Sequence, residues 1–121
     1  MNTQPEQLRN RTKKFALRVI RLFRSLPYKP DAQVLGKQLL RCGTSVAANY
    51  RAVCRARSKA AFVAKVGIVV EEVDESVLWL ELLTESGIVP EEKASELLLE
   101  ARELTAIFTA SQRTAQLGLA F

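Results

Sequence analysis

Apolar residues follow a helical period along most of this chain. They recur at intervals of three and four residues, which places them on one face of an α-helix. Prolines and glycines interrupt the pattern and divide it into four segments. The sequence therefore predicts four helices, at about residues 6–26, 31–56, 59–86 and 90–115. The third segment has the clearest period, through Phe62, Val66, Val69, Val73, Ser76, Leu80 and Leu83.

Residues near the segment ends favour helix caps. Asp31 and Ser58 precede helical runs and are suited to the N-cap position. Gly87 is suited to a helix C-terminus, and Pro90 to the first turn of the next helix. Because the connections are short, neighbouring helices should be antiparallel. We predict an all-α, up-down-up-down four-helix bundle formed as a single domain by residues 1–121.

Two features of the predicted helices suggest contacts beyond a simple core. Gly36 and Gly43 lie inside the second helix, where each costs about 1 kcal/mol relative to alanine, so we expect a close helix approach or a bend there. The third helix carries a second apolar strip in addition to its core face, and this strip suggests an interface. It consists of Ile68, Val70, Val77, Leu78, Trp79 and Leu82.

Charge is divided between the two halves of the chain. Residues 1–65 contain 15 of the 18 Lys and Arg residues and two of the 13 acids, whereas residues 66–121 contain three cations and 11 acids. Cations spaced along helices can contact successive phosphates without reading the base sequence. An alternative is a solvated face whose cations pair with acids of the third and fourth helices. The candidate nucleic-acid-binding residues are Arg11, Lys14, Arg18, Arg21, Arg51, Arg55, Arg57 and Lys59.

Several polar residues and both cysteines are expected to have structural roles in the core. Ser45 and Asn49 lie four residues apart on the second helix, where they could satisfy each other or a neighbouring backbone group in the core. Glu75 is predicted to face inward and to pair with Arg41 or Asn49. Cys42 and Cys54 are interpreted as small core residues. Twelve residues apart on one helix, they would be separated by roughly 18 Å, too far for a disulfide.

Catalytic and metal-binding signatures are missing from the sequence. The chain has no histidine, so the Glu-x-x-His pairs of di-iron bundles cannot form. We find no phosphate-binding glycine loop and no nucleophile elbow, and we predict no enzyme activity, no cofactor and no metal site. Residues 1–7 are polar, and no apolar run approaches the ~20 residues of a membrane span. We therefore expect a cytoplasmic protein without a membrane partner.

Short motifs resemble a known bacterial family. They are QLLR at residues 38–41, TSVAANY at residues 44–50, the pair Arg57-Ser58, Glu75 and Gly87. Together they resemble the four-helix-bundle proteins encoded in intervening sequences of large-subunit ribosomal RNA. In this family a glutamate usually follows the asparagine by three residues, and another completes the capping box. These positions are Ala52 and Ala61 here.

The resemblance implies a cytoplasmic bundle that assembles as a homopentamer. Related bundles serve retroelements, where they bind nucleic acid and a reverse transcriptase. We therefore predict a non-enzymatic homo-oligomer with a basic surface that binds RNA or DNA through phosphates. The alternative is an adaptor for a nucleic-acid enzyme such as a reverse transcriptase, without direct nucleic-acid binding. Peripheral membrane binding by the first helix is less favoured, because the bundle core should occupy its apolar face.

Overall fold

The computed structural model describes residues 4–118 and places four α-helices within them. They are α1 (Gln4–Arg24), α2 (Pro30–Cys54), α3 (Lys59–Glu85) and α4 (Glu91–Gln116). The predicted all-α, four-helix fold is confirmed. The single domain predicted for residues 1–121 includes residues 1–3 and 119–121, which lie outside the described residues.

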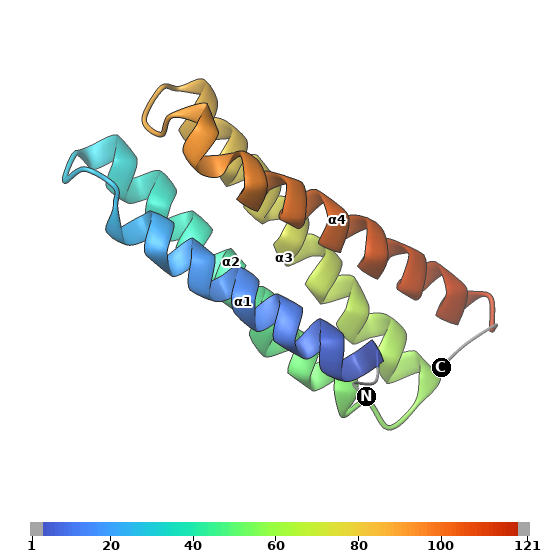
Figure 1. Cartoon of the computed structure of the whole chain (residues 1–121). Coiled ribbons are helices and arrows are strands. Elements are labelled where there is room, and N and C mark those ends of the chain that lie inside the picture. The colour runs from blue at the N-terminus through green and yellow to red at the C-terminus, as the bar shows by residue number, and fades with distance from the viewer. Residues whose placement is uncertain (1–3, 119–121) are drawn as a thin grey trace.

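Consecutive helices are packed side by side in antiparallel pairs (Figure 1). α2 lies against α1 and α3, and α4 lies against α3, whereas α1 approaches α4 more sparsely. The α1–α2 and α3–α4 loops lie at one end of the bundle, and the α2–α3 turn lies at the other end (Figure 1). The two hairpins of opposite charge therefore meet along two seams, α2–α3 and α1–α4.

The core is formed by one apolar face of each helix. The largest fully buried side chains include Phe15 of α1, Leu39 of α2, Leu80 of α3 and Phe108 of α4. The rings of Tyr50 and Phe108 pack with centroids 5.2 Å apart, which joins α2 to α4 across the bundle. Most of the periodic positions predicted for the third helix are buried, and Phe62 is half-buried. Burial of these apolar faces is the main force that stabilises the bundle.

The helix ends differ from the sequence prediction at two positions. Pro90, predicted for the first turn of the fourth helix, is instead the N-cap of α4, which begins at Glu91. The N-cap of α2 is Lys29, so the assignment of Asp31 was wrong. Pro30 occupies the first turn because its fixed φ suits a helix and its missing N–H leaves no donor unsatisfied. Ser58 does cap α3, since its Oγ accepts a hydrogen bond from the Ala61 N–H at 3.0 Å. At the other end of α3, Gly87 follows the C-cap residue Ser86. Its φ of 83° is a conformation that favours glycine.

Gly43 permits the close approach of α1 and α2. A Cβ placed at this residue would lie 2.9 Å from both γ-carbons of Val19, which is fully buried. Gly67 of α3 differs, because its added Cβ would meet only the end of the Gln112 side chain, at 2.7 Å. The cost of glycine inside a helix is therefore offset at Gly43 by helix packing.

Substitution of these two glycines by alanine should have different effects on stability. Alanine improves helix propensity by about 1 kcal/mol, but overpacking a core typically costs about 1–3 kcal/mol. We predict that Gly43→Ala lowers the free energy of unfolding by about 1 kcal/mol, whereas Gly67→Ala leaves it unchanged or raises it. Urea denaturation monitored by circular dichroism measures both changes. A Gly43→Ala variant as stable as the parent would contradict the proposed reason for this glycine.

Candidate nucleic-acid interface

A basic groove lies between α1 and α2. We define it by Arg9 and Lys13 of α1 and by Ala47, Ala48, Arg51, Cys54 and Arg55 of α2. It consists of two hollows, of about 300 and 280 Å³, which share Arg9 and Arg51. Among residues 4–118, no carboxylate lines either hollow. The groove therefore offers four cations to a single anionic ligand.

The helical repeat explains why these cations gather. Arg9 and Lys13 are four residues apart, as are Arg51 and Arg55, so each pair projects from one face of its helix. The small side chains of Ala47 and Ala48 leave space between the two helices. The four cations are exposed and form no ion pair within the described chain. Their charge therefore remains available to a ligand.

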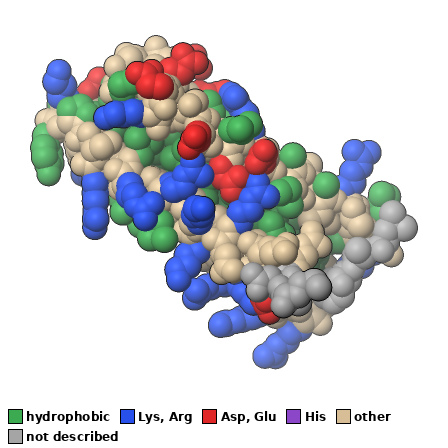
Figure 2. All heavy atoms as spheres, viewed as in Figure 1, with side chains coloured by type: hydrophobic (Ala, Val, Ile, Leu, Met, Phe, Trp, Pro, Cys, Tyr) green, Lys and Arg blue, Asp and Glu red, His purple; other side chains and the backbone are tan. Residues whose placement is uncertain are grey.

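Six of the eight predicted binding residues are free of ion pairs within the described residues. Arg51 and Arg55 line the basic groove, Arg57 lies on the exposed α2–α3 turn, and Lys59 is the exposed first residue of α3. Lys14 and Arg21 are exposed on α1 but lie outside the groove. Figure 2 shows Lys and Arg side chains projecting along one side of the molecule and toward the end that carries the termini.

The other two predicted residues face acids of α4. The Arg11 guanidinium donates to both oxygens of Glu100, at 2.7 and 2.8 Å, and also to Glu103 at 2.8 Å. Arg18 lies 3.9 Å from Glu96. The hydrogen bond from Arg11 lowers the pKa of Glu100, and the same bond raises the pKa of Arg11. For these two arginines the structure fits the alternative interpretation, in which cations of the first helix pair with acids of the fourth.

Arg9 and Lys13 were missing from the predicted set. The sequence signal was present, because both residues follow the same four-residue spacing as the α2 pair. Their position depends on which side of α1 faces α2, and a stripe of cations around most of the helix does not reveal this. The structure separates the stripe into a side that faces α4 acids and a side that faces α2 cations.

The polar positions interpreted as core lie nearer the surface. Glu75 does not face inward: its side chain is 47% exposed, and its carboxylate accepts a 2.8 Å hydrogen bond from Arg41. Asn49 donates to the backbone carbonyl of Ser45 at 2.9 Å, and both residues are half-buried. Solvent reaches Glu75 because it lies on the outer face of α3, away from the core positions. The partner Arg41 was among those predicted.

The two cysteines occupy different environments. Cys42 is fully buried, and burial raises the pKa of its thiol. Its sulfur also accepts a hydrogen bond from Ser76 at 3.2 Å. Cys54 is exposed in the basic groove, so its interpretation as a core residue was wrong. It is the last residue of α2 and lines the groove together with Arg9 of α1.

The fold defines the class of protein: an all-α four-helix bundle. The part of the chain that the structure describes contains no group of three side chains able to hold a metal ion. Within the same residues, no helix is both long enough and apolar enough to cross a membrane.

Comparison with known proteins gives the family. The model of the 23S rRNA-intervening sequence protein family matches residues 6–110, and the chain belongs to this family. The fold is similar to a solved structure from Bacteroides thetaiotaomicron, a protein of unknown function from the S23 ribosomal protein family. The TM-score is 0.84 at 28% identity, over 93% of this chain and 100% of that one. No curated protein matches the chain.

Removal of the Glu100 carboxylate should lower the free energy of unfolding at neutral pH and have no effect at strongly acidic pH. The pKa of Glu100 is lowered from its ordinary value of 4.5, so its ion pair stabilises the folded state above that pH. This contribution disappears as the pH falls through the lowered folded-state pKa. We predict that Glu100→Gln reduces the free energy of unfolding by about 1 kcal/mol at pH 7, and by nothing once both states are protonated.

Glu96→Gln is the matched control for this experiment. The Glu96 side chain is 92% exposed and its contact with Arg18 is long, so its removal should leave stability unchanged at every pH. Chemical denaturation of the three proteins across the acidic range provides the comparison. If the difference in free energy of unfolding between Glu100→Gln and the parent were the same at all pH values, the role assigned to the ion pair would be contradicted.

Proposed function

We propose that this protein is a non-enzymatic, self-associating bundle that binds RNA or DNA through phosphates at the basic groove. The observation that supports this most directly is the convergence of Arg9, Lys13, Arg51 and Arg55 around a space that no described carboxylate lines. The guanidinium groups of arginine bind phosphate oxygens with two parallel hydrogen bonds, and the ammonium group of lysine acts as a compact point charge. We also place the protein in the cytoplasm, where RNA and DNA are accessible.

Binding at this groove should be independent of base sequence. Sequence is read mainly at base edges, and in single strands the unstacked bases are usually held on aromatic side chains while their edges are read. Tyr50 is buried against Phe108 and Tyr28 lies in the α1–α2 loop, at the opposite end of α2 from Arg55. Neither ring can stack on a base held in the groove. Contacts therefore involve the backbone phosphates, with Arg57 and Lys59 extending the basic surface beyond the end of α2.

The outer face of α3 supports self-association. Ile68, Leu78 and Leu82 are 39–47% exposed and fall on one side of the helix. The indole nitrogen of Trp79 is buried without a hydrogen-bond partner among the described residues. A buried polar group of this kind usually has a partner, which a neighbouring subunit could supply. The homopentamer implied by the family resemblance is one such assembly.

The basic groove can be tested by removal of charge at matched positions. We predict that Arg51→Gln combined with Arg55→Gln weakens binding of a labelled RNA or DNA duplex about tenfold at low salt. Fluorescence anisotropy measures the affinity. The control combines Lys93→Gln with Arg113→Gln, which removes equal charge from exposed residues of α4 that form no ion pair within residues 4–118. Equal losses in the two variants would indicate attraction by net charge, without a site at the groove.

The self-association surface can be tested by substitution of exposed leucines. We predict that Leu78→Ser combined with Leu82→Ser converts the assembly to monomers at micromolar concentration, because the lost apolar area is the main source of association. Sedimentation velocity gives the mass of the assembly. Leu17→Ser, on the exposed side of α1, should leave the mass unchanged. A parent protein that sediments as a monomer would refute this part of the proposal.

A further inference from the structure

An acidic groove lies between α3 and α4, on the hairpin opposite the basic groove. Its volume is about 560 Å³, and we define it by Glu81, Thr84 and Glu85 of α3 with Glu91, Ala94, Ser95, Leu98, Leu99 and Arg102 of α4. The groove lies next to the α3–α4 loop, whereas Arg51 and Arg55 lie near the α2–α3 turn at the other end of the bundle (Figure 1). The two grooves are therefore separate surfaces.

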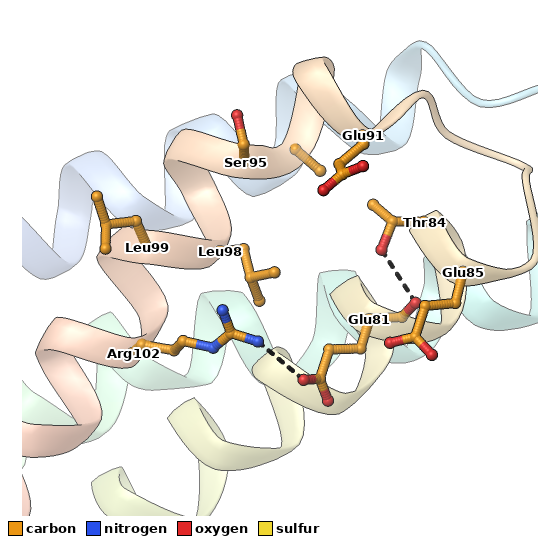
Figure 3. A pocket seen from close by; sticks show the side chains of 9 residues that line it. Glu81, Thr84, Glu85, Glu91, Ser95, Leu98, Leu99 and Arg102 are labelled. Carbon is orange, nitrogen blue, oxygen red and sulfur yellow. Dashed lines mark hydrogen bonds and ion pairs between the residues drawn. The ribbon is translucent and has the colours of Figure 1, made fainter.

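The groove combines an apolar floor with unneutralised carboxylates. Leu98 and Glu91 of α4 point into the space between the helices (Figure 3), and Glu85 lines the groove from α3. Leu99, beside Leu98, is 59% exposed. Glu81 is held by Arg102 at 2.9 Å, but Glu85 and Glu91 form no ion pair within residues 4–118. Two carboxylates and an exposed leucine are thus left for a ligand.

We propose that this acidic groove binds a cationic amphipathic helix of a partner protein. Such a helix places leucine-like side chains on one face and Lys or Arg beside them, which matches the leucine floor and the glutamates along the rim. The charges complement each other, and burial of the leucines adds an apolar contribution. A nucleic acid is disfavoured here, because its phosphates would meet the carboxylates.

A second copy of this chain fits the groove less well. The two cationic helices, α1 and α2, each present one exposed large apolar residue, Leu17 and Val34, and their other large apolar residues are buried or half-buried. The groove offers the exposed Leu99 and the adjacent, half-buried Leu98. A partner helix with two apolar residues one turn apart would fill it, and it could bind while nucleic acid occupies the basic groove. The inference therefore does not depend on the proposed function.

A synthetic peptide tests this inference. The probe is a fluorescein-labelled peptide of Lys and Leu only, with leucines at helical spacing, and the control peptide has the same composition in a non-amphipathic order. We predict that the amphipathic peptide binds the full-length protein more tightly than the control peptide does. Glu85→Gln combined with Glu91→Gln should weaken binding about five- to tenfold. Leu99→Ser should weaken it by a similar factor.

Two matched variants make the result specific to the groove. Glu71→Gln combined with Asp74→Asn removes equal charge from exposed positions of α3 away from the groove, and Leu17→Ser removes an exposed leucine from α1. Both should bind the peptide as the parent does. Equal weakening in groove and control variants would overturn the proposal. It would also be overturned if the groove variants lost self-association in sedimentation, because the groove would then be an interface between copies.

Discussion

The partial neutralisation of charge along the α1–α4 seam is the constraint that decides where charge remains on the surface of the bundle. The bundle brings a cationic hairpin against an acidic one, yet only some of the charges meet. Arg11 and Arg18 face Glu100, Glu103 and Glu96, whereas the cations on the α2 side of α1 face other cations. The outward sides of both hairpins therefore keep their own charge. One molecule carries a basic groove and an acidic groove because its helices are paired in this order.

This order is itself set by close packing. Gly43 brings α2 against Val19 of α1, and that contact fixes which side of α1 is turned toward α2. Arg9 and Lys13 lie on this side and so meet Arg51 and Arg55. A residue with a side chain at position 43 would separate the helices and widen the groove. The electrostatics of the surface are thus linked to a steric feature of the core.

Most of the fold could be predicted from the sequence, because apolar periodicity and helix breakers act locally. The period through Val66, Val69 and Val73 determined the buried face of α3, and Ser58 determined its start. The N-cap of α2 was misassigned because the preference of Pro30 for the first turn outweighed the capping tendency of Asp31. The candidate site could be predicted less completely from the sequence. Whether Arg11 pairs with an acid, or whether Glu75 and Cys54 reach solvent, depends on the rotation of each helix about its own axis.

The salt dependence of nucleic-acid binding tests the central claim most directly. Four cations that contact phosphates release about four counterions, so the logarithm of affinity should fall with the logarithm of salt concentration at a slope between about −3 and −4 per protomer. Titration of the parent protein with a labelled single strand or duplex over a range of salt concentrations gives this slope. A slope near zero, or no binding at low salt, would show that the cations of the basic groove do not hold phosphates.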